Sequence, residues 1–190
     1  MKREGKVVLA FIGSLWIAMP IYMILHEGGH ALIASLYGAK IIEFNIMEGY
    51  VIVEGGVFNE ITLALFYAAG MLTPVAIFTI YLMRYQRGTD KDCYKVFSVV
   101  FAGIILFSIG VWVVMPIQYM LGIANPNDDV VKFIEALEVA PLIVIVLASL
   151  LMSIYTWAIW KKRIFQNGYK SLKAGGYAEE YKSDYRIDHE

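Results

Sequence analysis

The sequence predicts an all-α, polytopic membrane protein with four transmembrane helices and a small β-hairpin between the first and second helices. Of its 190 residues, 59% are hydrophobic and only 17% are charged, whereas about a quarter of the residues in a soluble domain are charged. Four apolar runs reach the roughly 20 residues that a helix needs to cross a bilayer. We therefore expect an integral, multi-pass protein of the cell membrane.

Two further counts limit the classes of function. The formal net charge of −1 gives no reason to expect a nucleic-acid partner, which requires a basic surface. The single cysteine, Cys93, excludes an internal disulfide and any zinc cluster built from cysteines.

The four predicted spans are long apolar segments. The first is uncharged over residues 7–25 and becomes apolar again after His26 and Glu27, up to residue 39. The other three cover residues 61–83, 96–124 and 139–160.

Lysines and arginines gather on the cytoplasmic side of membrane proteins. Here most of them precede the first span, separate the second from the third, or follow the fourth. The other two loops, roughly residues 40–60 and 124–138, are poor in basic residues and carry only Lys40 and Lys132. We therefore predict that both termini are cytoplasmic. The chain then divides into a membrane-embedded core, residues 1–160, and a polar cytoplasmic tail, residues 161–190.

The segment between the first two spans, KIIEFNIMEGYVIVEGGVF, has the pattern of strands rather than of a helix. Ile42, Phe44 and Ile46 alternate with polar residues, and a second alternating run begins at Tyr50 after Glu48-Gly49. This pattern predicts a β-hairpin. The alternative is an interfacial loop without a ladder.

The motif HEGGH at residues 26–30 lies inside the first span. Residues four apart share one face of a helix, so His26 and His30 can bind one zinc ion. Glu27 lies about 100° around the helix and can act as general base on a water that zinc activates. The alternative is a polar cluster that stabilises helix packing, although ionisable residues inside spans are rare and usually functional.

The two glycines between the histidines also allow two interpretations. Glycines weaken a helix by about 1 kcal/mol each relative to alanine. Gly28 and Gly29 can let a neighbouring helix approach closely, or they can leave room for a substrate beside the metal.

A catalytic zinc site needs a third protein ligand. His189 lies in the predicted tail, on the opposite side of the membrane from the motif. Asp128 and Asp129, after the turn Asn125-Pro126, are candidates, and so are the other carboxylates of the two basic-poor loops. The competing interpretation is helix capping, with Asn127 or Asp128 as the cap of a helix that begins there.

With these residues the chain resembles the site-2 protease family of intramembrane zinc metalloproteases. Members similar to this chain carry HExxH in an apolar helix, and an aspartate after a proline in a later span is their third ligand. Pro126-Asn127-Asp128 matches that arrangement and favours Asp128. The family usually has glycine after the aspartate, where this chain has Asp129, so the choice between the two stays open. The segment AAGMLTPVA, residues 68–76, is also similar to the family's second core span.

The resemblance implies a zinc metalloendopeptidase that performs regulated intramembrane proteolysis. Its substrates would be single-span membrane proteins, and it would lie in the lipid bilayer. Whether it also forms a homo-oligomer with a second copy of the chain stays open. In this scheme the edge of the predicted hairpin supplies hydrogen bonds to the unwound substrate. The alternative is an inactive, protease-like module for metal binding or transport. A di-iron hydroxylase needs more histidines than the three present.

Overall fold

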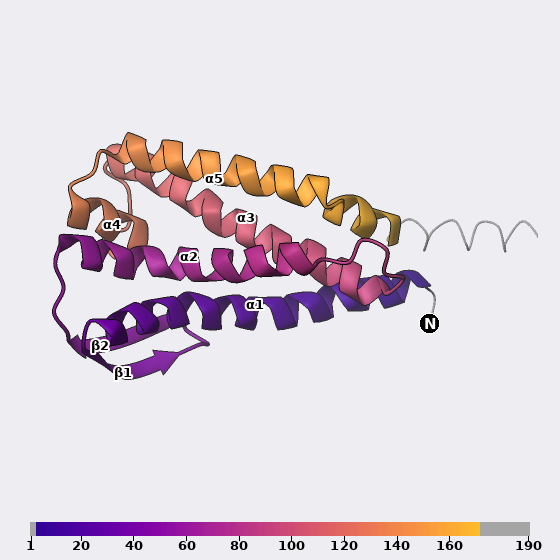
Figure 1. Cartoon of the computed structure of the whole chain (residues 1–190), viewed down its shortest axis with the longest axis horizontal. Coiled ribbons are helices and arrows are strands. Elements are labelled where there is room, and N and C mark those ends of the chain that lie inside the picture. Colours follow the sequence, from indigo (N-terminus) through magenta and orange to yellow (C-terminus); the bar gives the residue numbers. More distant parts are fainter. Residues whose placement is uncertain (1–2, 172–190) are drawn as a thin grey trace, which may run out of the picture.

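A computed structural model describes residues 3–171 of the chain, and Figure 1 shows its arrangement. Five labelled helices and two strands follow one another in the described residues, and a further helical stretch lies at residues 164–171. In chain order they are α1 (Arg3–Leu36), β1 (Ala39–Asn45), β2 (Tyr50–Gly55), α2 (Glu60–Arg84), α3 (Asp92–Met120), α4 (Asp129–Leu137) and α5 (Pro141–Lys161). The hairpin and α4 lie at one end of the bundle, and the N-terminus and the end of α5 lie at the other.

Four of these helices, namely α1, α2, α3 and α5, are long and apolar enough to cross a membrane. The predicted fold class is therefore confirmed, and the chain has the structure expected of a multi-pass membrane protein. The third helix ends at Met120 rather than at residue 124 as the hydropathy suggested. Gly122 follows with a φ of 71°, and this left-handed conformation ends the helix.

The predicted hairpin is also confirmed. Strands β1 and β2 pair antiparallel, with Asn45 opposite Tyr50 and Ala39 opposite Gly55. The register shifts between Ile41 and Glu43, where one residue bulges out of the ladder. In the turn, the side-chain oxygen of Asn45 accepts two backbone N–H groups, each 3.1 Å away.

The hairpin folds back along α1 rather than continuing away from it (Figure 1). Its tip, Ile46 and Met47, shares an apolar pocket with Pro20 and Met23 of α1. The hairpin therefore stands beside the middle of the first span, at the level of the HEGGH motif.

The hydrophobic core lies mainly between α2, α3 and α5. Phe78, Ile105 and Ile159 are completely buried there, and the rings of Phe78 and Phe101 meet edge to face with centroids 5.2 Å apart. The helix α1 is attached to this core mainly through α2 and α3. Much of its remaining apolar surface is exposed, as in a helix that faces lipid.

The short helix α4 is strongly amphipathic. Val130, Val131 and Ile134 are buried and pack it onto α2 and α3. The Asp128 carboxylate caps its N-terminus, and Asp129 in the first turn lies beside the two histidines of α1. This docking determines where the side chains of the first turn lie.

The boundary predicted at residue 160 falls one residue before the end of α5 at Lys161. After α5 the chain turns at residues 162–163 and continues as a helix over residues 164–171. Ile164 and Ser171 are buried, and Gly168 lies against Val99 of α3. The remainder of the predicted tail, including His189, lies outside the described residues.

Candidate metal centre

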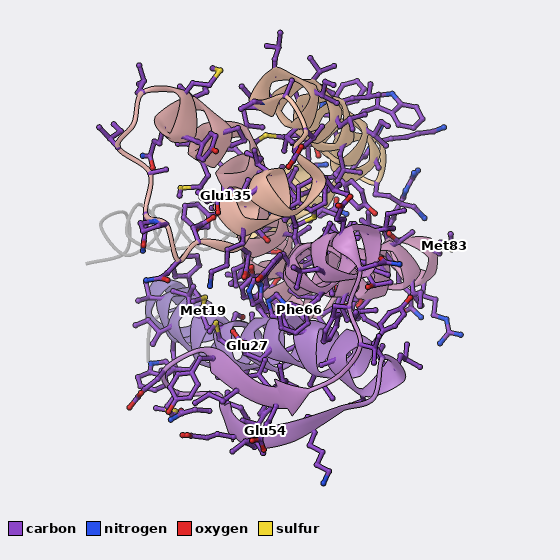
Figure 2. All side chains as sticks on the ribbon, turned by 90° about the vertical axis from the view of Figure 1, so that its left-hand side faces the viewer. Met19, Glu27, Glu54, Phe66, Met83 and Glu135 are labelled. Carbon is purple, nitrogen blue, oxygen red and sulfur yellow. The ribbon has the colours of Figure 1, made fainter. Side chains whose placement is uncertain are left out.

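The HEGGH motif lies on α1 at the end of the bundle that carries the hairpin. His26 and His30 are one turn apart, and their rings meet edge to face with centroids 5.0 Å apart. His30 is 3% exposed. Figure 2 looks onto this end of the bundle and shows Glu27 and Phe66 on the neighbouring helices α1 and α2. The motif therefore faces the protein interior.

Asp129 completes a group of three potential ligands. Its Oδ2 atom lies 3.4 Å from Nε2 of His26 and 3.1 Å from Nε2 of His30. The three ligand atoms all lie within 4.8 Å of one another. In a tetrahedral site with bonds of 2.0–2.1 Å, neighbouring ligand atoms are about 3.3 Å apart. The distances from Asp129 to the two histidines therefore match those between neighbouring ligands of one metal ion.

Asp128, which the resemblance favoured, has a different position. Its Oδ1 atom accepts the backbone N–H of Val130 at 2.8 Å, and the residue is the N-cap of α4. The side chain of an N-cap residue turns back over the helix end that it caps, whereas the next side chain, that of Asp129, extends toward α1. The geometry therefore reverses the order of preference between the two aspartates.

The two aspartates also differ in charge. Burial opposes ionisation of Asp129, but its interactions with His26 and His30 outweigh burial and hold the pKa of this carboxyl below its usual range. Burial raises the pKa of Asp128, and the hydrogen bond from the Val130 backbone only partly offsets it. Of the two, Asp129 is therefore the carboxylate that is ionised over the wider pH range.

One wall of the site is formed by the backbone of α2 at Gly70. A Cβ atom built on Gly70 of α2 would lie 2.5 Å from Nε2 of His30 and 2.7 Å from Nε2 of His26. Gly70 thus leaves free the space that the two ligand nitrogens face. Because a side chain there would fill this space, the site is a cradle whose shape depends on glycine.

The other two glycines have separate roles. A Cβ atom on Gly29 would overlap the carbonyl oxygen of Ala69 and lie 2.6 Å from Oγ1 of Thr73. Gly29 therefore permits close packing of α1 against α2. A Cβ atom on Gly28 would meet nothing within 4 Å, so Gly28 is not required for packing.

The outer nitrogens of both histidines are hydrogen-bonded. Nδ1 of His30 lies 2.7 Å from the carbonyl oxygen of Phe66. A carbonyl only accepts, so Nδ1 carries the proton and the neutral ring presents the lone pair of Nε2 to the site. Nδ1 of His26 lies 3.3 Å from the hydroxyl of Tyr22, which donates to Ser108 at 2.9 Å. The Tyr22 oxygen is then free to accept from His26, which orients this ring similarly.

Glu27 is 4% exposed and stands beside the ligand group without belonging to it. Its Oε1 atom is 4.0 Å from Nε2 of His26. Glu27 lines a cavity of about 390 Å³ together with both histidines and Asp129. The other walls come from the start of β2, the first turns of α2, and the loop and first turn around α4, which contribute Tyr50, Val51, Phe66, Tyr67, Asn125, Asn127 and Lys132. Glu27 therefore lies beside free space as well as beside the two histidines.

The other loop carboxylates considered as ligands are not in the group. Among the described residues, His26, His30 and Asp129 form the cluster with metal-binding spacing, and it includes neither the glutamates of the hairpin nor those of α4. Sequence reasoning missed the supporting residues Tyr22 and Gly70. Tyr22 precedes His26 by four residues and so shares its helix face, and Gly70 lies in the small-residue segment AAGMLTPVA.

Comparison of the chain with protein-family models, with curated proteins and with solved structures finds no match. The class of this protein therefore has to be described from its fold and its site alone. The chain is a four-span membrane protein of helices with a two-stranded hairpin. A His-His-Asp cluster lies between α1, α2 and α4, with His30 buried and the other two residues half-buried.

Proposed function

We propose that this protein is an intramembrane zinc metalloendopeptidase that hydrolyses peptide bonds in or near the transmembrane segments of other membrane proteins. His26, His30 and Asp129 would hold the zinc ion. The observation that carries the proposal is the position of Glu27: a buried carboxylate stands next to a three-ligand cluster without being part of it.

The residues have separate roles in this reaction. When bound, zinc supplies Lewis acidity that polarises the scissile carbonyl and makes a water nucleophilic. Glu27 takes a proton from the attacking water and later delivers it to the leaving amine, as the C–N bond breaks. The hydrogen bonds that the two imidazoles donate to the Phe66 carbonyl and to the Tyr22 hydroxyl keep both rings oriented toward the metal position.

The hairpin has a role in substrate binding. A peptide bond inside a membrane helix is hidden by its own hydrogen bonds, and an unwound segment needs new partners. Tyr50 and Val51, at the start of β2, line the cavity beside Glu27. We propose that the unwound substrate adds to this two-stranded sheet as a further strand.

A module that only binds or transports metal is the alternative function. Metal binding or transport alone does not require a carboxylate that lies close to the ligand cluster but outside it. Glu27 would also be costly to bury without a task. The position of Glu27 therefore favours the hydrolase.

The experiment compares purified wild type with Glu27→Gln on a single-span model substrate in lipid vesicles. Wild type should yield two fragments whose masses sum to substrate plus one water, and a chelator should abolish the reaction until zinc is returned. Glu27→Gln should lose cleavage. Glu54→Gln is a matched control because Glu54 is exposed on the hairpin and outside the cavity. Equal cleavage by wild type and Glu27→Gln would refute the proposal.

A further inference from the structure

The ligand cluster lies between two cavities of opposite character. On the hairpin side is the polar cavity of about 390 Å³. On the other side, between α1 and α3, is a groove of about 680 Å³ whose lining is almost entirely apolar. His26, Asp128 and Asp129 line both. The site is therefore the place where an apolar and a polar compartment meet.

One full face of α1 forms the first wall of the groove. Phe11, Leu15, Met19, Tyr22 and His26 follow each other at intervals of three or four residues and all line it. This face is about 22 Å long at 1.5 Å per residue. The groove therefore runs along most of a membrane span and ends at a metal ligand.

One face of α3 forms the second wall. Val100, Gly103, Ile104, Phe107 and Val111 line it at helical intervals. A Cβ atom on Gly103 would meet nothing within 4 Å, and Phe107 is 76% exposed. Gly103 lies halfway along the wall and widens the groove, and the exposed Phe107 forms part of its open surface.

The geometry points to one occupant: a transmembrane segment of the substrate lies in the α1–α3 groove, and the polar stretch that follows it enters the hairpin-side cavity. The scissile bond is then at the junction between the apolar and the polar part. This inference rests on the proposed function and adds the substrate's orientation and the position of the cut. Continuity of the groove with His26 and Asp129 supports a peptide as occupant, since a chain that fills both compartments must pass the ligand cluster.

The polar compartment fits the second part of such a substrate. Asn125, Asn127 and Tyr50 offer hydrogen-bonding groups. Lys132 is the one lysine in the lining, and its ammonium lies 5.8 Å from the ring centre of Tyr67. An apolar segment would leave the polar groups of these side chains without hydrogen-bond partners. The apolar part of the substrate therefore lies in the groove and its polar part in the hairpin-side cavity.

A cross-linking experiment tests the docking independently of catalysis. A photoreactive phenylalanine analogue replaces Phe107 in the groove or, as control, Leu147, which is exposed on α5 outside the groove. The carrier is the Glu27→Gln variant, mixed in phosphatidylcholine vesicles with a synthetic polypeptide that has one apolar segment and a polar tail. We expect adducts from position 107 and not from position 147. Equal adducts from both positions, or none, would overturn the inference.

Cleavage mapping provides the second arm. Four leucines inserted at the end of the apolar segment should move the cut by four residues, and Gly103→Leu should lower kcat/KM roughly tenfold by filling the groove. Gly13→Leu is the matched control because Gly13 is equally open but outside the groove. A cut that stays at the same residue would overturn the inference and leave the proposed function intact. Adducts at position 107 without cleavage by wild type would overturn the proposed function and leave the docking of the apolar segment intact.

Discussion

Two adjacent aspartates illustrate how much a single position decides in this site. Asp128 and Asp129 were both candidates for the third ligand, because both follow the turn at Asn125-Pro126, and the family resemblance favoured Asp128. The start of α4 separates them: the N-cap side chain is held by the backbone of Val130, and the next one reaches the histidines. The spacing of residues in the sequence does not predict this difference, because the difference depends on which residue begins the helix.

The first prediction concerns this pair. Asp129→Asn should reduce zinc in the purified protein well below one per chain, because a charged ligand is removed. Asp128→Asn should keep zinc, since asparagine caps a helix as well as aspartate does. Asp128→Ala should also keep zinc but lower the free energy of unfolding by about 1 kcal/mol through loss of the cap. Metal analysis and denaturation measure both effects, and metal loss in Asp128→Asn would contradict the assignment.

The second prediction concerns Gly70. A methyl group there would lie where the two Nε2 atoms face, so Gly70→Ala should prevent zinc binding without removing a ligand. Gly28→Ala is the control, because a Cβ atom on Gly28 meets nothing within 4 Å. The alanine at position 28 should favour the helix by up to about 1 kcal/mol. Equal zinc content in the two variants would show that Gly70 does not shape the site.

At the scale of elements, three segments far apart in the chain contribute different groups to the site. The helix α1 gives two imidazoles and the proposed general base, α2 gives a carbonyl group and the space at Gly70, and α4 gives the carboxylate of Asp129. The length of the apolar runs predicted the spans, and alternation predicted the hairpin. They did not predict that the hairpin lies back along α1, because that position depends on contacts such as the close approach of Gly49 to the Met23 side chain.

The hydroxyl of Tyr22 provides the third prediction, which concerns the connection between α1 and α3. Tyr22→Phe removes the acceptor of His26 Nδ1 and the donor to Ser108. Such supporting bonds typically change metal affinity by about 10–100-fold, so we expect weaker zinc binding in competition with a chelator. Tyr155→Phe, which removes a hydroxyl bonded to Thr79 away from the site, should leave zinc affinity unchanged. A Tyr22→Phe protein with wild-type affinity would contradict the orienting role.

The hairpin gives the fourth prediction. Ile52 lies in the middle of β2, opposite Glu43, and proline at this position removes a backbone donor and disturbs the strand. Ile52→Pro should slow cleavage while zinc content stays at the wild-type value, because Ile52 is not among the ligands. Unchanged cleavage would count against addition of the substrate to this edge.

At the scale of the whole molecule, four spans bring the two ends of the bundle to opposite sides of the membrane. The starts of α2 and α3 lie at these opposite ends (Figure 1). Most basic residues lie between α2 and α3, near the N-terminus, and after α5, whereas the other end has only Lys40 and Lys132. We therefore propose that the end rich in basic residues is cytoplasmic. The metal centre then lies nearer the outer face.

The fifth prediction tests this orientation with the chain's own cysteine. Cys93 is free and exposed in the first turn of α3. A membrane-impermeant maleimide should label it only after cells are permeabilised. A variant with Glu60→Cys and Cys93→Ser should be labelled in intact cells, because Glu60 begins α2 at the other end. The opposite labelling pattern would reverse the orientation and leave the chemistry of the site unaffected.

The central claim is that one metal held by His26, His30 and Asp129 and one base, Glu27, together hydrolyse a peptide bond. The most direct test measures zinc per chain and substrate cleavage on the same purified preparation of wild type, Glu27→Gln and Asp129→Asn. We predict about one zinc and cleavage for wild type, zinc without cleavage for Glu27→Gln, and neither for Asp129→Asn. A Glu27→Gln protein that cleaves like wild type, or an Asp129→Asn protein that keeps both zinc and activity, would contradict the account.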